Sequence, residues 1–421
     1  QPNGAPCNNG TMGHGRSILV PALKIWPAHR AYGWAMDKPA PIQFLPAIQQ
    51  LRGIAAALVV VVHAINVSDY RVAHGLDGQS AWLARTLAFN EIGAMGVDLF
   101  FVISGFVMAM MLARSGPQAR VRDFAFDRFA RVAPLYWVAS LLFAVVLIAV
   151  GRPIEPGALL TSLTIVPTGG ITYTSPILVV GWSLAFELAF YALVAASLAL
   201  PTSWRMPAVA LVLAVCGWLG TVWHPPAGLW GVIINPIVGE FLVGIGCYLL
   251  WRRYRGTVPA LACHALILLG AALLIRTGVM GYDFETPHMP VLRGETGLAR
   301  LMTWALPWAM ILLGMAWADG AGKMATDPAA TSTVPSSPMA RALRRVGDAS
   351  YSLYLVHMVI CTLAESWLPS GLVPPDVVIA GVVILSLLVG IKAHDRVELP
   401  LMALLKRYHP RHMRAGAAAA I

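Results

Sequence analysis

The chain has 421 residues, of which 58% are hydrophobic and only 12% are charged. A soluble domain carries about 25% charged residues, so half that supply does not cover a water-exposed surface. The composition therefore excludes an ordinary soluble protein and predicts an integral membrane protein. The formal net charge is +10. Because Lys and Arg gather in the cytoplasmic loops of membrane proteins, we expect the lipid bilayer as a partner and no nucleic acid.

Ten apolar segments follow one another along the chain, and each is of the length that crosses a bilayer. A spanning helix needs roughly 20 apolar residues. The segments cover approximately residues 48–67, 94–112, 134–150, 177–200, 206–223, 229–251, 258–275, 298–318, 350–368 and 376–393. The pattern predicts an all-α polytopic bundle of about ten transmembrane helices.

Lys and Arg are unequally divided between the loops on the two sides of these spans. The poorer side holds only Arg71, Arg85, Arg152, Arg276, Arg293 and Arg300. The richer side should be cytoplasmic, and both termini then lie in the cytoplasm. We expect a multi-pass protein of the bacterial inner (plasma) membrane.

The domain organisation predicted from composition is simple. Residues 46–410 form one membrane domain, preceded by a Gly- and Pro-rich extension, 1–45, that we expect to be disordered and that lacks the apolar core of a signal peptide. Residues 319–345 should be a flexible cytoplasmic loop, and 411–421 a disordered tail. Between them, His394–Tyr408 is expected to lie as a short helix along the cytoplasmic face. The five cysteines form no CxxC pair, so we expect no metal site and no disulfide framework.

Ionisable residues inside spans are unfavourable in lipid and often mark functional sites. Arg52 and His63 lie in the first span. Eleven residues at about 100° each return His63 to the helix face of Arg52, roughly 16 Å further along the axis. An Arg–His pair on one face of a span is a candidate site.

Three later spans carry further polar groups. The second contains Asp98 and Ser104, of which Asp98 is expected near the outer interface. The fourth carries Ser183, Glu187 and Tyr191 at i, i+4 and i+8, which places them on one face. In the ninth span one face carries Ser350, Tyr354 and His357. Each group has an alternative interpretation as a purely structural contact between helices.

A basic segment precedes the third span. It contains Arg128 and Arg131, followed by Pro134, Tyr136 and Trp137. Arg beside a membrane commonly sets topology, and guanidinium groups also make paired hydrogen bonds to phosphates. The segment is therefore a candidate phosphate site within a loop.

Taken in order, these segments resemble the acyltransferase-3 family of bacterial membrane O-acyltransferases. The resemblance rests on six short motifs: Leu51-Arg52-Gly53 with His63, Gly96-Val97-Asp98 through Ser104-Gly105-Phe106, Arg128-Phe129-Ala130-Arg131, Trp182-Ser183-Leu184 with Glu187, Ser350-Tyr351-Ser352 with His357, and Glu398 with Pro400. The opening motif is most similar to the exopolysaccharide acyltransferase branch. Many members have Asp-Gly, Arg-Arg and Glu-Glu where this chain has Gln49-Gln50, Asp127-Arg128 and Glu187-Leu188.

The resemblance implies transfer of an acyl group, usually acetyl, from a coenzyme A thioester to a hydroxyl of a sugar. It implies no tightly bound cofactor; acetyl-CoA or another acyl-CoA is the donor, and a carbohydrate or lipid-linked oligosaccharide is the acceptor. We expect His63 to be the general base, Arg52 to stabilise negative charge, and Glu187 to orient His63 or the acceptor. The expected donor-binding residues are Arg128, Arg131, Ser104 and Tyr136. The expected acceptor-binding residues are Asp98, Trp182, Tyr191, Tyr354 and His357.

Two other functions fit the same features. Spans with buried Arg, His and Glu also suit a proton-coupled transporter of a small molecule or glycan precursor. A flippase-like assembly partner without catalysis is a third alternative. A covalent acyl-histidine intermediate also remains open within the enzyme interpretation.

Overall fold

The computed structural model describes residues 45–79, 81–82, 89–165, 175–226, 228–279, 288–321 and 337–410. All regular secondary structure in these ranges is helical, which confirms the predicted all-α class. The expected N-terminal extension, apart from Leu45, and the expected C-terminal tail lie outside these residues.

The helices fall into long and short groups. The long ones are α1 (Pro46–Ala73), α3 (Phe89–Arg114), α4 (Val121–Ala149), α6 (Gly181–Ser197), α7 (Thr202–Val222), α9 (Gly239–Tyr254), α10 (Ala260–Val279), α13 (Leu306–Ala321), α15 (Ser350–Trp367) and α16 (Pro375–Ala393). The shorter ones are α5 (Pro156–Thr164), α8 (Leu229–Ile233), α11 (His288–Leu292), α12 (Gly297–Arg300), α14 (Pro338–Asp348) and α17 (Leu399–Lys406). A 3-10 turn, η1 (Pro236–Val238), and two π-helical segments, η2 (Leu301–Ala305) and η3 (His394–Glu398), connect some of them.

Eight helices in the described ranges are long and apolar enough to cross a membrane. A ninth candidate is the pair α14 and α15, which meet at a bend of 77°. The apolar helix α6 lies within the predicted fourth span and has 17 residues. The protein is therefore a multi-pass membrane protein, while the predicted count of ten is not confirmed. The cytoplasmic location of both termini stays a prediction.

We predicted that the segment carrying Arg128 and Arg131 is a loop. The structure shows instead that it is part of α4, which starts at Val121. Pro134 lies inside this helix rather than before it. Proline removes a backbone donor, but the helix continues through it. The basic residues thus project from a rigid helix at fixed spacing.

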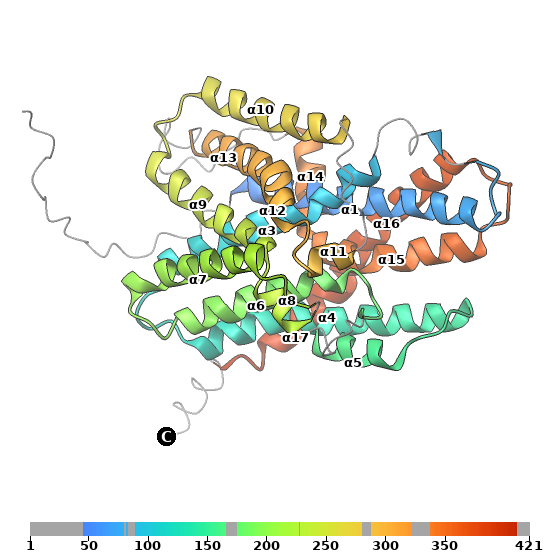
Figure 1. Ribbon diagram of the computed structural model, residues 1–421, viewed down its shortest axis with the longest axis horizontal. Coiled ribbons are helices and arrows are strands. Elements are labelled where there is room, and N and C mark those ends of the chain that lie inside the picture. Colours follow the sequence, from blue (N-terminus) through green and yellow to red (C-terminus); the bar gives the residue numbers. More distant parts are fainter. Residues whose placement is uncertain are drawn as a thin grey trace, which may run out of the picture. The chain divides into compact units, whose positions relative to one another are not determined.

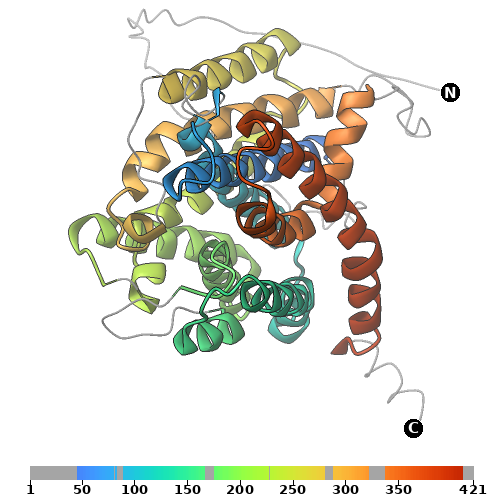
Figure 2. The ribbon, with the colours of Figure 1, turned by 90° about the vertical axis from the view of Figure 1, so that its right-hand side faces the viewer.

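Two further segments also differ from the expectation. The predicted separate helix at His394–Tyr408 is continuous with α16, through η3 into α17, in a single run Pro375–Lys406. Figure 2 shows this run in red, reaching down to α4. Of the predicted loop 319–345, residues 319–321 belong to α13 and 338–345 to α14, whereas 322–336 lie outside the described residues.

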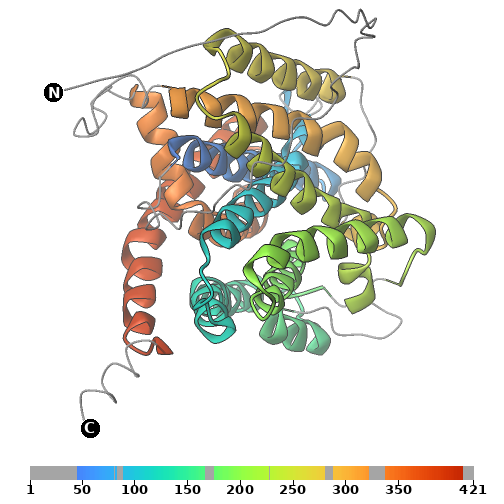
Figure 3. The same ribbon diagram turned by 90° about the vertical axis from the view of Figure 1, so that its left-hand side faces the viewer.

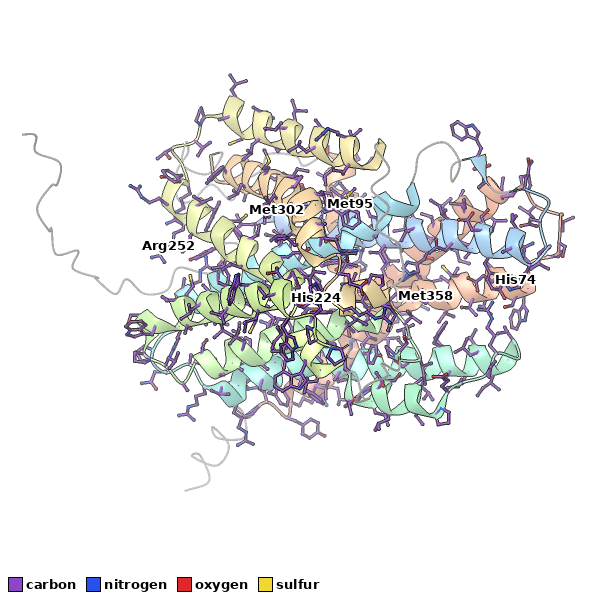
Figure 4. All side chains as sticks on the ribbon, viewed as in Figure 1. His74, Met95, His224, Arg252, Met302 and Met358 are labelled. Carbon is purple, nitrogen blue, oxygen red and sulfur yellow. The ribbon has the colours of Figure 1, made fainter. Side chains whose placement is uncertain are left out.

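Most long helices lie side by side, lengthwise in Figure 1 and from the two ends in Figures 2 and 3. Helix α1 packs against α3, α14, α15 and α16. His74, just after α1, and Arg252, near the end of α9, lie at opposite ends of the bundle (Figure 4). Arg71, three residues before His74, belongs to the side that the charge pattern predicts to be poor in Lys and Arg.

Two glycines let helix backbones touch. A Cβ on Gly347 of α14 would lie 1.8 Å from the carbonyl oxygen of Gln49 in α1. A Cβ on Gly105 of α3 would lie 2.1 Å from the carbonyl oxygen of Phe241 in α9. Small residues allow such close approach between membrane helices. These contacts fix α14 and α9 against the two helices that carry Arg52 and Ser104.

A buried ion pair joins the far ends of α1 and α15. Arg71 is 1% exposed, and its Nε donates to Asp77 over 2.7 Å. Its other nitrogens donate to Asp77 and to the carbonyls of Ala364, Leu368 and Pro369. These hydrogen bonds lower the pKa of Asp77 below its ordinary value, and the backbone N–H of Gly371 adds to the effect. The pair holds the end of α1 against the end of α15.

Candidate active site

A cavity of about 120 Å³ lies among α1, α3, α4, α6 and α15. Such a volume accommodates several water molecules. Seven of the residues expected at the site line it: Arg52, Ser104, Arg128, Arg131, Glu187, Tyr191 and Tyr354. Helices remote in sequence thus bring most of the predicted residues together.

Three arginines and one carboxylate are the charged residues that line the cavity. Arg52 donates from Nη2 to Ser350 Oγ over 2.9 Å, which links α1 to the first residue of α15. Arg128 lies over two rings, with its Cζ 5.2 Å from the Phe124 centroid and 5.3 Å from that of Tyr191. Its buried Nε has no hydrogen-bond partner among the described residues. The excess of guanidinium groups over carboxylates suits an anionic ligand.

Glu187 is the acidic residue of the cavity, and it is held by hydroxyl groups. Its Oε1 accepts a hydrogen bond from Ser104 Oγ over 3.0 Å and another from the hydroxyl of Tyr191. Ser104 belongs to α3, whereas Glu187 and Tyr191 are one turn apart on α6. The predicted one-face arrangement on α6 therefore produces a direct contact. Glu187 is thus oriented by hydroxyls rather than by either imidazole.

Tyr354 forms the wall between this cavity and the next layer of side chains. Its hydroxyl donates to the carbonyl of Val180 over 2.8 Å and lies 2.8 Å from Ser183 Oγ. One edge of its ring meets Phe100 at a centroid distance of 6.2 Å. The ring centroid of His357 lies 6.1 Å away on the same helix. Tyr354 therefore contacts both the arginine cavity and the histidine layer.

His63 and His357 are not among the residues that line the cavity. They lie against each other, with ring centroids 4.9 Å apart and ring planes at 68°. The Nδ1 of His63 is 2.8 Å from the carbonyl oxygen of Val59, and that of His357 is 3.1 Å from the carbonyl oxygen of Leu353. Two histidines that are far apart in the sequence thus form one pair beyond Tyr354.

Asp98 does not face the cavity and binds Arg300 instead. Arg300 donates from Nη2 and Nε to the two Asp98 oxygens, over 2.7 and 3.1 Å. Asp98 is fully buried and Arg300 is 4% exposed. Our prediction placed both residues near the same outer interface but assigned Asp98 to acceptor binding. Its oxygens are occupied, so we leave Asp98 out of the proposed acceptor site.

Tyr136 and Trp182 lie together at a separate small hollow. They line a space of about 10 Å³, roughly the room that one water needs. Tyr136 is fully buried, and its hydroxyl occupies the place that a Cβ on Gly181 would take, at 2.6 Å. Neither residue lines the arginine cavity. They pack the start of α6 against α4.

Sequence reasoning missed two buried polar groups. Glu240 of α9 is fully buried and lies beside the ion pair of Asp98 and Arg300. Glu398 accepts hydrogen bonds on Oε2 from Ser352 over 2.6 Å and from His394 over 2.8 Å. An acidic residue within an apolar span was the available signal for Glu240. Glu398 was identified only as part of a motif. Its contact with Ser352 was not predicted, because it depends on the π-helical segment η3.

The described residues contain no group of three His, Cys, Asp or Glu side chains placed to hold a metal ion. The polar groups of the site are instead three arginines, a carboxylate with two hydroxyls, and an imidazole pair. These are groups that bind anions and transfer protons.

Comparison with known proteins gives a consistent assignment. Residues 45–392 match the model of a family described as an acyltransferase domain, acyltransferase-3. The exopolysaccharide production protein ExoZ of Rhizobium meliloti is 32% identical over 342 residues, which cover 78% of this chain and 94% of ExoZ. The acyltransferase MdmB of Streptomyces mycarofaciens is 24% identical over 414 residues, or 88% of this chain and 95% of MdmB.

A third relative is shorter. Protein 2 in the picA locus of Rhizobium radiobacter is 32% identical over 205 residues, which cover 43% of this chain and 94% of that protein. No solved structure gives a significant match. The family match spans most of the membrane domain and includes all the cavity residues, and it favours the enzyme over the transporter that the sequence left open. The chain belongs to the acyltransferase-3 family and is a multi-pass membrane acyltransferase.

Proposed function

We propose that the enzyme transfers an acyl group, in the first instance acetyl, from a coenzyme A thioester to a hydroxyl of a cell-surface polysaccharide or its lipid-linked precursor. ExoZ, an exopolysaccharide production protein that is 32% identical to this chain, supports a polysaccharide acceptor. The observation that supports a coenzyme A thioester as the donor is the cavity, which is lined by Arg52, Arg128 and Arg131 and by one carboxylate. Coenzyme A offers phosphates that guanidinium groups bind by paired hydrogen bonds.

The separation of the arginines from the histidine pair fits a long donor. Arg52 and His63 are eleven residues apart on α1, which corresponds to roughly 16 Å along the helix. Coenzyme A carries its thioester at the end of a flexible arm, away from its phosphates. A donor with its phosphates at the arginine cavity would therefore direct its acyl end past Tyr354 toward His63. In this proposal, donor binding and chemistry occur at two levels of the same helix.

His63 is the proposed general base. A backbone carbonyl only accepts hydrogen bonds, so the contact with Val59 places the hydrogen on Nδ1 and the lone pair on Nε2. During transfer the acceptor oxygen bonds to the acyl carbon, the carbon–sulfur bond breaks, and His63 Nε2 takes the hydroxyl proton. That proton finally joins the departing thiolate. Such a base contributes about 100- to 10,000-fold in rate.

The remaining residues have supporting proposed roles. Arg52 stabilises negative charge on the donor or in the transition state. Arg128, Arg131 and Ser104 bind the donor, and Tyr136 supports the helix that carries Arg128. Glu187, held by Ser104 and Tyr191, positions the acceptor or the donor arm. Trp182, Tyr191, Tyr354 and His357 are retained around the acceptor path. We further propose that the protein resides in the bacterial inner membrane with both termini in the cytoplasm.

Binding of the donor by purified protein tests this proposal. Isothermal titration of acetyl-CoA into protein in lipid nanodiscs should give saturable binding. Substitution of Arg131 by Gln should weaken it, roughly tenfold for each charged hydrogen bond of about 1.5 kcal/mol that is lost. Arg293, which is 55% exposed and pairs with Glu295 at 3.8 Å, provides a matched control. Absence of acetyl-CoA binding by the wild type would favour a transporter.

A further inference from the structure

His63 and His357 form a pair of imidazole rings outside the arginine cavity, with ring centroids 4.9 Å apart. They belong to α1 and α15, which pack against each other. His357 is fully buried and His63 is half-buried. The pair lies one layer beyond Tyr354, on the side away from the arginines.

Both rings carry their lone pair on the same nitrogen, Nε2. The Nδ1 contacts to the carbonyls of Val59 and Leu353 place the hydrogen of each ring on Nδ1. Each Nε2 therefore carries the lone pair of the neutral ring. The Nε2 of His357 is buried and has no hydrogen-bond partner among the described residues. A buried acceptor without a partner is rare in folded proteins and calls for an explanation.

The surroundings of the pair contain few other polar groups. On α15 the neighbour is Tyr354, whose hydroxyl is already bonded to Val180. The nearest acid further along α15 is Glu365, two turns away, which pairs with Arg152 at 2.8 Å. No hydrogen bond or ion pair joins either imidazole to a carboxylate in the described ranges. The orienting acid that often accompanies a catalytic histidine is therefore replaced here by a second imidazole.

Helix α16 contributes one polar group at this level. A Cβ on Gly390 of α16 would lie 2.9 Å from the Cα of Leu353 on α15. One turn from that contact along the antiparallel helices, Ser386 stands at the level of His357. Its Oγ is also buried and without a partner in the described residues. Ser386 is thus a matched control for a polar group at the same depth.

We propose that His357 is a proton-accepting partner of His63 in acyl transfer. The inference rests on the proposed function. After His63 Nε2 has taken the hydroxyl proton, its new N–H donates to Nε2 of His357, and the pair holds the proton until the thiolate takes it. A hydrogen bond of about 2.9 Å between two imidazole nitrogens places the ring centroids about 5 Å apart. The observed centroid separation of 4.9 Å matches this distance.

His357 acts through His63 and is a positioning residue. It should therefore affect the turnover number and leave donor binding unchanged. His357→Leu removes the acceptor nitrogen at similar volume, while His357→Gln keeps an acceptor oxygen. Once His63 is replaced by Gln, loss of His357 should have no further effect, because the two act as one unit.

The test measures thiol release from acetyl-CoA by protein in nanodiscs. The acceptor is polysaccharide isolated from a strain that lacks the gene. We expect His357→Leu to lower kcat roughly 10- to 100-fold, within the range of general acid–base effects, with KM for acetyl-CoA unchanged. We expect His357→Gln to recover part of the loss and Ser386→Ala to behave as wild type. Kinetic constants are compared only between variants whose melting temperature equals that of the wild type.

Three outcomes would overturn the inference. They are wild-type kcat in His357→Leu, a loss in Ser386→Ala as large as in His357→Leu, and a further loss when His357→Leu is added to His63→Gln. If the wild type itself releases no thiol from acetyl-CoA, the proposed function fails instead, and the two failures are distinguishable.

Discussion

The guanidinium group of Arg52 donates a hydrogen bond to Ser350 Oγ over 2.9 Å, and this bond joins the first span to the start of α15. Lys at position 52 keeps the charge but loses the planar fork. Because hydrogen bonds to charged groups contribute about 1.5–3 kcal/mol, Arg52→Lys should lower kcat/KM for acetyl-CoA by roughly 10- to 100-fold. Ser350→Ala, which leaves the guanidinium group in place, should have a smaller effect. Equal kinetics in Arg52→Lys and wild type would remove Arg52 from the site.

The sequence predicted the helical class and most residues of the cavity because both depend on local patterns. Apolar length marks the spans, and the i, i+4, i+8 spacing placed Glu187 and Tyr191 on one face, where they bond. Contacts between different helices could not be predicted from the sequence. The pairing of Asp98 with Arg300 joins residues 202 positions apart, and no periodicity within one helix encodes such a contact.

The same limit explains the largest difference between the expected and observed site. Arg52 and His63 share a helix face, so the sequence suggested one site containing both. The structure divides them, because Tyr354 of α15 packs between the arginine cavity and the imidazole pair. The prediction that the basic segment is a loop was wrong. Proline commonly stands at the first position of a helix, whereas Pro134 lies within α4.

The Asp98–Arg300 pair predicts strong destabilisation when only one partner is removed. Arg300→Met leaves the buried Asp98 carboxylate without its counterion, at a cost of about 3–5 kcal/mol. Membrane abundance and melting temperature should both fall sharply. The exposed pair of Arg293 and Glu295 is the control, and Arg293→Met should change stability by about 1 kcal/mol or less. Similar melting temperatures for the two variants would contradict the structural role of Asp98.

Gly347 should tolerate no side chain. Alanine at this position would bring Cβ within 1.8 Å of the backbone oxygen of Gln49, so α14 would have to move away from α1. We expect Gly347→Ala to lower both the melting temperature and acyl transfer. Gly246 of α9 has open space at the corresponding position, and Gly246→Ala should be neutral or stabilising by up to about 1 kcal/mol. An unchanged Gly347→Ala protein would mean that α14 is not packed as described.

The ion pair of Arg71 and Asp77 predicts a dependence of stability on pH. The folded-state pKa of Asp77 lies below its ordinary value of 3.8, so folding favours the ionised carboxylate. Its stabilising contribution is complete above the ordinary value and is lost as the pH falls through the lower folded-state value. Wild type should therefore melt above Asp77→Asn by a constant margin between pH 7 and 5. Below pH 3.8 the margin should shrink; a margin independent of pH would argue against the ion pair.

The central claim is that this protein acylates a polysaccharide hydroxyl with His63 as base. The most direct measurement is the O-acyl content of the surface polysaccharide in a deletion strain, complemented with wild-type protein or with His63→Ala at matched membrane abundance. We predict that wild type restores the ester and that His63→Ala does not. Full restoration by His63→Ala would contradict the assigned base, and an ester content unchanged by the deletion would contradict the polysaccharide acceptor.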